Sequence, residues 1–284
     1  MRQKVLLIIS IVNIISCSPR VVVSPIKTEE AVKDYEGFIV FKEDEIFNIN
    51  GDEIGNIEIK DGGLTLDCDY ETVISIAKIE AQKLGANCLR IYEHRLPSTF
   101  GSKCHRIKAK AYRVMDISPF EKEIIWNSHR RLNRNDFKGS IENRPFEAAT
   151  NSSIRVRLHN KTLNGKSIIS VEAFFNCQNS YFKGTTNAIE TMEHEQGHFD
   201  ITEIYARKLR KEMIEQIHSQ SDLEQKYENI YRQITNENYI NQDKYDTEIY
   251  KDSSLQKQWL LKIQQDLDSL KEFEETNISI SVKS

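Results

Sequence analysis

Residues 192–203 read Met-Glu-His-Glu-Gln-Gly-His-Phe-Asp-Ile-Thr-Glu, and the chain around this segment decides the fold of the C-terminal half. One glycine and no proline occur between Asn187 and Ser219, so the composition predicts a single long helix there. Asn187 and, three residues later, Glu190 have the pattern of a capping box at the start of that helix. We therefore expect the quoted segment to lie within the first turns of the helix.

The chemistry of this segment depends on its helical spacing. A separation of four residues turns a helix by about 400°, so His194 and His198 project from one face and can bind one cation. Neutral imidazoles suit zinc, with bonds of about 2.0–2.1 Å. Glu195 lies about 100° around the helix from His194, where it can accept a proton from water instead of binding the metal. The pattern predicts a zinc site with His194 and His198 as ligands and Glu195 as catalytic base.

The surroundings of the motif strengthen this interpretation through a resemblance. The shared features are Met192 to Glu203, Ala206 to Arg210, Trp126, Arg131-Leu132, Asp136-Phe137-x-Gly139 and Ala148-Ala149-Thr150. Together they resemble a predicted secreted zinc-dependent protease family of bacteria, which is catalogued as a domain of unknown function. The resemblance implies a zincin-like metalloprotease domain that acts on a protein or peptide substrate, and it does not identify that substrate.

A third zinc ligand is less clear from the sequence. His218 lies twenty residues beyond His198, which is about 30 Å along a continuous helix, so it cannot join the site. Tyr245-Asp246-x-Glu248 resembles the family's later Tyr-Asp motif, but the histidine that follows that motif in the family is absent here. We expect Glu248 to complete the site, as in zincins whose third ligand is a glutamate from a following helix. Tyr245 is either an oxyanion donor or, as the commoner pattern, a packed core residue.

The N-terminus has the pattern of a bacterial lipoprotein signal. The apolar stretch over residues 5–15 is shorter than the 20 or so residues that span a membrane, and a short positive segment precedes it. The following Ser16-Cys17 resembles the end of a lipobox. We expect residues 1–16 to be removed, Cys17 to be lipidated, and residues 17–30 to form a tether. An ordinary signal peptide that happens to contain a cysteine is the alternative.

Export would place the other four cysteines in an oxidising compartment, where disulfides persist. Four cysteines allow three complete pairings. Cys68 and Cys104 both lie in turn-like settings, so we expect a disulfide between them. Cys88 begins an apolar run and Cys177 lies in a strand-like segment, so both are expected to be free thiols.

Residues 31–116 are predicted to form a small α/β domain. Strand-like patterns cover residues 37–41, 55–60, 89–93 and 106–114, and residues 71–84 have helical spacing. Gly85 is placed to end this helix in the left-handed conformation.

A second resemblance concerns this small domain. Ala77, Ala81, Gly85-Ala86-Asn87 and the run from Gly101 to Arg106 resemble the domain of RcsF, an outer-membrane lipoprotein that senses envelope damage. The alternative is an unrelated α/β domain with the same order of elements. A sensing role would not follow from the fold alone.

Residues 117–275 are predicted to form the zincin-like metalloprotease domain, which makes the whole chain α+β. Strands are expected at 153–158 and 167–175, and residues 254–273 form an amphipathic helix that packs in the core. Residues 276–284 are expected to be a tail.

The charge and the motifs together favour an envelope metallopeptidase over an inactive scaffold. The net charge of −4, with lysine and arginine spread along the chain, does not favour nucleic acid as a partner. We expect an envelope-anchored zinc metallopeptidase, attached to the lipid bilayer through acylated Cys17 at the periplasmic face of the outer membrane. The alternative is a catalytically inactive zincin-like lipoprotein that acts as an envelope sensor or interaction scaffold, which the missing family histidine favours.

Overall fold

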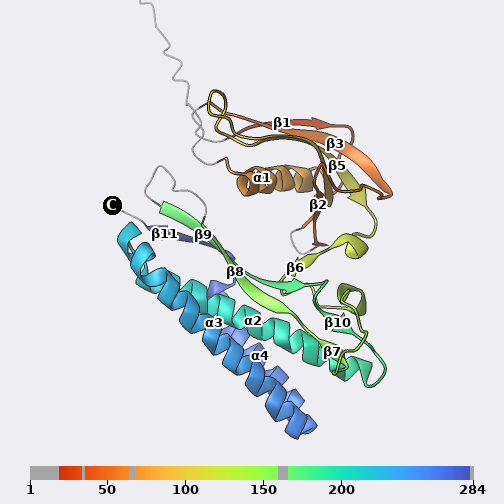
Figure 1. Ribbon diagram of the computed structural model, residues 1–284, viewed down its shortest axis with the longest axis vertical. Helices are drawn as coiled ribbons and strands as arrows, with labels where there is room; N and C mark the ends of the chain where they lie inside the picture. The colour runs from red at the N-terminus through yellow and green to blue at the C-terminus, as the bar shows by residue number, and fades with distance from the viewer. Residues whose placement is uncertain (1–18, 34–35, 64–67, 159–165, 282–284) are drawn as a thin grey trace, which may run out of the picture.

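The computed structural model describes residues 19–33, 36–63, 68–158 and 166–281, and Cys17 lies outside these ranges. The fold is α+β, and two units, each with its own sheet and helices, follow one another along the long axis of the molecule (Figure 1). Among the described helices, none has both the length and the apolar character needed to cross a membrane.

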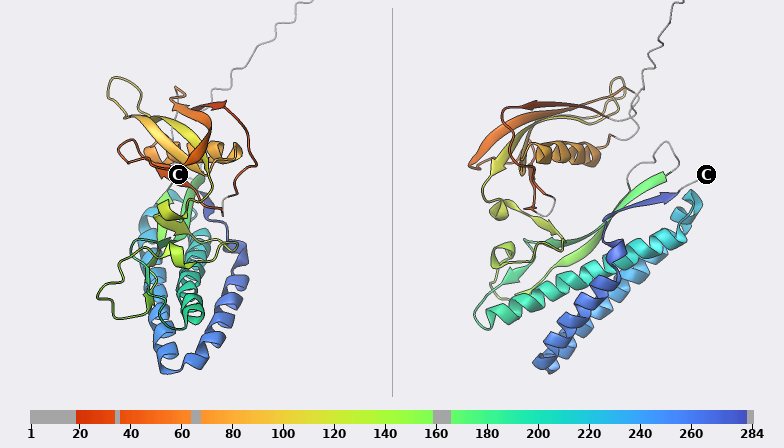
Figure 2. Two further views of the ribbon diagram at one scale, coloured as in Figure 1. Left: turned by 90° about the vertical axis from the view of Figure 1, so that its right-hand side faces the viewer. Right: turned by 180° about the vertical axis from the view of Figure 1, so that it is seen from behind.

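The N-terminal unit is a five-stranded sheet with one helix packed against it. Its elements are β1 (Arg20–Pro25), β2 (Ile39–Phe41), β3 (Gly51–Lys60), α1 (Tyr70–Lys83), β4 (Cys88–Arg95) and β5 (Arg106–Val114). The strand order is β1-β3-β5-β4-β2, and only the pair β2 and β4 is parallel. Helix α1 covers the face of the sheet that is turned toward the C-terminal unit (Figures 1 and 2). The four strands and the helix expected between residues 37 and 114 are therefore all present.

Strand β1 corrects the expectation of a tether over residues 17–30. Val21 and Val23 pair with Ile59 and Ile57 of β3 and pack against the core of the unit. A valine-rich run favours an extended strand once a partner strand is available. Among the described residues, the N-terminal unit begins with β1 at Arg20.

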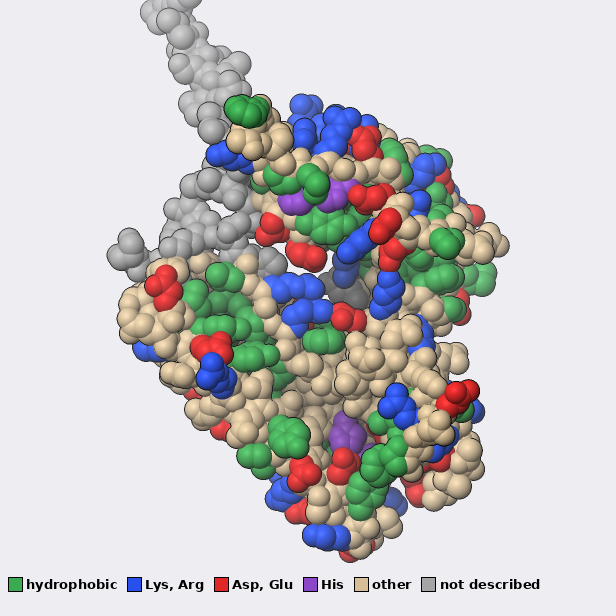
Figure 3. Space-filling view, viewed as in Figure 1, with side chains coloured by type: hydrophobic (Ala, Val, Ile, Leu, Met, Phe, Trp, Pro, Cys, Tyr) green, Lys and Arg blue, Asp and Glu red, His purple; other side chains and the backbone are tan. Residues whose placement is uncertain are grey.

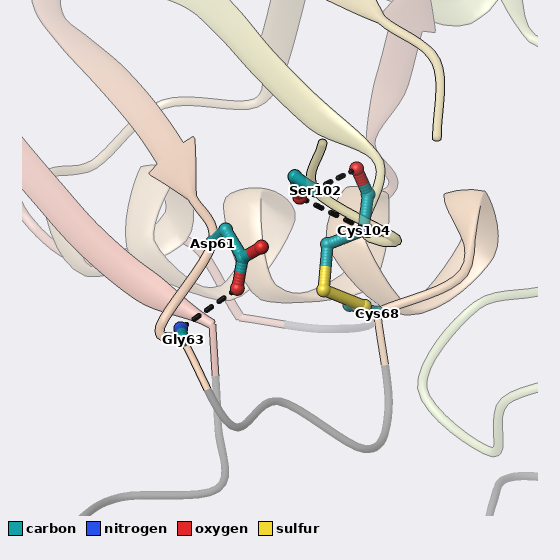
Figure 4. The surroundings of a disulfide bond; sticks show 5 residues. All are labelled: Asp61, Gly63, Cys68, Ser102 and Cys104. Atoms are coloured by element: carbon teal, nitrogen blue, oxygen red, sulfur yellow. Dashed lines mark hydrogen bonds between the residues drawn. A yellow bond between two sulfur atoms is a disulfide. The ribbon is translucent and has the colours of Figure 1, made fainter. Parts of the chain in front are cut away.

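The predicted disulfide between Cys68 and Cys104 is present and joins the entrance of α1 to the segment before β5 (Figure 4). The Cys68 carbonyl oxygen also accepts a hydrogen bond of 3.0 Å from the His105 amide. Cys88 and Cys177 are buried free thiols, as expected, and burial raises their pKa values to about 12 and about 11. At the other end of α1, Gly85 has a φ of +90°, which confirms the predicted left-handed cap.

The C-terminal unit combines a sheet with three long helices. Its elements are η2 (Ser118–Phe120), β6 (Glu123–Ile125), η3 (Arg134–Asp136), β7 (Ala148–Ala149), β8 (Ser152–Leu158), β9 (Lys166–Asn176), β10 (Tyr181–Phe182), α2 (Ala188–Gln216), α3 (Gln220–Lys251), η4 (Ser253–Leu255), α4 (Gln256–Ser269), η5 (Lys271–Phe273) and β11 (Asn277–Ser281). Strand β9 is central: β8 pairs along one edge, and β11 and β6 share the other. Helix α2 lies between this sheet and helices α3 and α4 (Figure 2).

Strand β11 corrects the expectation of a tail over residues 276–284. Ile278 and Ile280 are buried, and they pair with Ile169 and Ser167 of β9. The alternation of isoleucine and serine in this short stretch is a strand pattern that needs a partner edge to become stable.

The start of α2 also differs from its predicted form. Asn187 has a left-handed backbone with a φ of 41°, and its side chain makes no capping bond, so the expected capping box with Glu190 does not form. The Glu147 carboxylate instead accepts from the Thr186 amide at 3.2 Å and from the Thr185 amide. A distant carboxylate therefore satisfies amides just before the helix.

A buried ionic network holds α2 in its unit. The Glu203 carboxylate accepts from Arg207 Nε at 2.9 Å and from Arg210 at 2.8 Å, and all three residues are almost fully buried. Arg210 donates to the Val171 carbonyl oxygen of β9, and Arg207 donates to the Leu267 carbonyl oxygen of α4. The network thus joins the central helix to the sheet on one side and to α4 on the other.

Candidate metal centre

Helices α2 and α3 pack in opposite directions, which brings one face of each helix against the other. His194 lies opposite Asp246, and His198, one turn later on α2, lies opposite Gln242, one turn earlier on α3. Asp246 Oδ1 is 3.0 Å from His194 Nε2 and 3.0 Å from His198 Nε2, and the two Nε2 atoms are 3.1 Å apart. Three atoms that can ligate a metal therefore converge at one point.

Gln242 determines which ring nitrogen of His198 presents a free lone pair to Asp246. The Gln242 Nε2 group donates to the His198 carbonyl oxygen at 2.9 Å and to Thr202 Oγ1 at 3.1 Å. Its Oε1 atom lies 2.6 Å from His198 Nδ1 and must accept, so Nδ1 carries the proton. This leaves the lone pair of Nε2 directed at the point of convergence, as in histidines that bind a metal through Nε2.

The three convergent atoms attract positive charge. Burial alone would raise the pKa of Asp246, but its bonds to the two histidines outweigh burial and hold the pKa well below its usual range. Burial alone would lower the pKa of His198, but the hydrogen bond to Asp246, the charges of Asp246 and Glu195 and the bond to Gln242 together outweigh burial and raise the pKa. An ionised carboxylate and an imidazole lone pair 3.0 Å apart cannot satisfy each other without an extra proton or a metal ion between them.

The spacing of the ligand atoms fits a small divalent cation. A tetrahedral zinc centre with bonds of about 2.0–2.1 Å separates its ligands by about 3.3–3.4 Å. The three observed separations of 3.0, 3.0 and 3.1 Å are close to that value. Two imidazoles and one carboxylate leave the fourth position of such a centre open, which is the ligand set of a catalytic zinc site. The residues of the site therefore fit a small divalent cation such as zinc.

Glu195 is buried next to the two histidines and is only 3% exposed. Its Oε2 atom has no hydrogen-bond partner among the described residues, although it is buried. Burial raises the pKa of Glu195, and the neighbouring histidines partly oppose that effect. A buried carboxylate with a free oxygen and a raised pKa is suited to accept a proton. The Thr150 hydroxyl, next to β7, donates to the Glu195 carbonyl oxygen at 3.1 Å and fixes this turn of the helix.

Tyr245 packs in the core against the site. Of the two roles expected for it, the structure shows the packed core residue. Its side chain is fully buried, its ring stacks on the His194 ring at 4.7 Å, and its hydroxyl donates to the His194 carbonyl oxygen at 3.3 Å. Gly197 makes this packing possible, because a Cβ there would lie 2.3 Å from the Tyr245 hydroxyl oxygen. The glycine of the motif therefore allows α3 to approach α2 closely.

The opposite face of α2 is fastened by a second set of polar contacts. Asp200 Oδ1 accepts from the Trp126 indole at 2.8 Å and from the Gln196 amide at 2.8 Å. Gln196 Oε1 in turn accepts from the Leu132 backbone amide at 2.7 Å. These contacts set the rotation of α2 about its axis and so keep the histidine face toward α3.

Glu248 does not join the site, which corrects the prediction of the third ligand. Its carboxylate accepts from the Trp259 indole at 3.0 Å and lies 3.7 Å from Lys244 Nζ. Two residues turn a helix by about 200°, so Asp246 and Glu248 point to opposite sides of α3. Asp246 stands within the quoted Tyr-Asp motif, and that motif was the signal that could have identified it. Gln242, four residues earlier on the same face, is a second residue that the sequence analysis missed.

Comparisons of the chain with models of protein families, with curated proteins and with solved structures find no match. The interpretation of the site therefore depends on its own geometry.

Proposed function

We propose that the protein is a zinc-dependent metallopeptidase and that His194, His198 and Asp246 hold the zinc ion. One observation carries this proposal: three ligand atoms converge within 3.1 Å of one another beside a buried glutamate that has an unpartnered carboxylate oxygen. Asp246 supplies a third possible ligand atom although the later histidine of the family is absent, and this favours an enzyme over an inactive scaffold.

The residues of the site divide the reaction between them. Bound zinc supplies a Lewis acid that makes water more acidic and polarises a carbonyl. Glu195 takes a proton from the attacking water as the water oxygen bonds to the carbonyl carbon of the substrate. The same carboxyl group then delivers that proton to the leaving amine as the carbon–nitrogen bond breaks. The Tyr245 ring stacks on the His194 imidazole and Gln242 Oε1 accepts from His198 Nδ1, so these two residues hold the imidazoles in the orientation that this step needs.

The test of the enzymatic role is Glu195→Gln in the full chain. Because Glu195 is not a ligand, the variant is expected to keep zinc and to lose about 10²–10⁴ in hydrolysis rate, the usual effect of losing a general base. Zinc is measured by elemental analysis, and cleavage is measured on a quenched-fluorescence peptide library. A Gln variant as active as the wild type would contradict the role of Glu195. A wild-type protein that takes up no zinc during reconstitution would contradict the whole proposal and favour the scaffold.

The test of the ligand set compares two acidic residues of α3. Asp246→Ala removes a converging oxygen, so we expect it to lower zinc retention strongly. His194→Ala and His198→Ala are expected to abolish retention, because each removes a ligand nitrogen. Glu248→Ala is the matched control, since its side chain contacts Trp259 and Lys244 instead. Loss of zinc in Glu248→Ala with full retention in Asp246→Ala would reverse the assignment.

We further propose that the protein is anchored in the cell envelope through acylated Cys17, on the lipobox-like sequence before it. Since β1 begins at Arg20, the proposed anchor at Cys17 lies three residues before that strand. In Cys17→Ala, acyl labelling and membrane association should both disappear, and labelling equal to the wild type would exclude this anchor.

A further inference from the structure

Two exposed aromatic side chains stand beside the metal centre. Tyr250 follows Asp246 by four residues on α3, so both project from one face, and its ring centroid lies 6.3 Å from that of His194. The Phe146 ring stacks on Tyr250 with a centroid distance of 6.1 Å and an angle of 17° between the planes. Phe146 is 53% exposed and Tyr250 is 65% exposed. We call these two rings the aromatic wall.

The backbone that presents Phe146 is anchored on both sides. The Arg144 carbonyl oxygen accepts from Lys183 Nζ at 2.7 Å. On the other side, the Glu147 carboxylate accepts from the Thr185 hydroxyl at 2.8 Å and from the Thr186 amide at 3.2 Å. The segment that carries Phe146 is therefore held by contacts on both sides of this residue.

The surface around the metal centre carries both acidic and hydrophobic side chains, which suits a partner that is partly polar and partly apolar. Histidine reaches the face of the C-terminal unit shown in Figure 3, next to acidic and hydrophobic side chains. Large apolar side chains that are exposed directly beside a reactive centre are typical of a binding site, whereas exposed apolar side chains scattered over a protein are ordinary surface. The aromatic wall is continuous with the centre through the contact between Tyr250 and His194.

The distances fit one occupant. An extended peptide rises about 3.3 Å per residue, so the residues one or two positions from the cleaved bond lie about 3–7 Å from it. The Tyr250 ring centroid lies 6.3 Å from that of His194, so the aromatic wall adjoins the residues that would hold the metal. Aromatic rings attract aromatic side chains through stacking and edge contacts in addition to burial of apolar area.

We propose that the aromatic wall binds a large apolar side chain of the substrate, one or two residues from the cleaved bond. The substrates are then extended peptide segments with an aromatic or a large aliphatic residue at that position. This inference rests on the proposed peptidase function, because the occupant is defined by its distance from the site of cleavage. It goes beyond that function by naming the class of substrate.

The experiment measures peptide binding in place of turnover. The full chain carrying Glu195→Gln is titrated into two fluorescein-labelled peptides of glycine, serine and alanine, one with a central phenylalanine and one with alanine there. We expect the phenylalanine peptide to bind roughly threefold to tenfold more tightly, the range of a single aromatic contact. Adding Phe146→Ala or Tyr250→Ala should remove most of this preference, whereas Tyr250→Phe keeps the ring and should retain it. Phe100→Ala, a fully exposed ring in the N-terminal unit, is the matched control.

The outcomes separate this inference from the proposed function. Equal binding of the two peptides, or a preference that survives both alanine variants, would overturn the aromatic wall even if the wild type holds zinc and cleaves peptides. Loss of the preference in Tyr250→Phe would assign the effect to the hydroxyl and would also overturn it. A preference lost only in the two alanine variants supports the wall, and it does so even if the wild type fails to cleave, in which case the peptidase function alone is wrong. Zinc content and thermal melting of each variant exclude a folding defect.

Discussion

Gln242 is expected to control how tightly the centre binds zinc, although its side chain is not a ligand. Gln242→Ala removes the acceptor that lies 2.6 Å from His198 Nδ1. Without that acceptor, His198 can carry its proton on Nε2, where it blocks the ligand lone pair, or its ring can rotate. Loss of such a partner typically weakens metal binding by about 10- to 100-fold. That range corresponds to about 1.4–2.7 kcal/mol.

The assay is competition for zinc against a chromophoric chelator at neutral pH, on the full chain. Gln242→Glu is the matched variant: it keeps an acceptor for Nδ1–H but loses the donor to the His198 carbonyl oxygen, so we expect it to hold zinc more tightly than Gln242→Ala. Nitrogen chemical shifts of labelled histidine should show the Nδ1 proton of His198 in the wild type. Wild-type zinc affinity in a folded Gln242→Ala protein would refute the reasoning, since His198 would then be oriented by something else.

Three further changes test the packing of the two units by chemical or thermal unfolding. Gly197→Ala should destabilise the protein by about 1–3 kcal/mol, because its Cβ would overlap the Tyr245 hydroxyl; a stability equal to the wild type would contradict this tight contact. Glu203→Ala should cost about 3–5 kcal/mol, since it leaves the fully buried Arg210 without its carboxylate, and a loss below 1 kcal/mol would count against the network. Cys68→Ser opens a disulfide that spans 36 residues and should cost about 3–4 kcal/mol; an unchanged unfolding midpoint under oxidising conditions would refute it.

The regular elements followed from local patterns. Helical spacing over residues 71–84 and the glycine after it predicted α1 and its left-handed end at Gly85. The long stretch without proline between Asn187 and Ser219 predicted α2, because helix formation depends mainly on neighbours within four residues. The cap of α2 could not be predicted in the same way, since the carboxylate that accepts from the Thr186 amide belongs to Glu147, 39 residues earlier in the chain.

The sequence indicated a tether where β1 lies and a tail where β11 lies, for a related reason. β1 and β11 are edge strands of six and five residues, and each is stable only because a longer strand offers it a free edge. The short segments around Val21 and Ile278 have a strand pattern, but that pattern does not predict a strand until the partner strands are known.

The metal centre shows most clearly which features the local sequence determines and which depend on tertiary contacts. The sequence by itself determined that His194 and His198 share a helix face and that Glu195 stands beside it, because four residues of helix leave no other arrangement. Only the tertiary structure decided that Asp246 joins them, that Gln242 orients His198 and that Glu248 faces Trp259. Several residues of α3 carry side chains that can bind a metal or a histidine. Which of them face α2 depends on the register and rotation of two packed helices, and long-range contacts such as those of Gly197 and Asp200 set both.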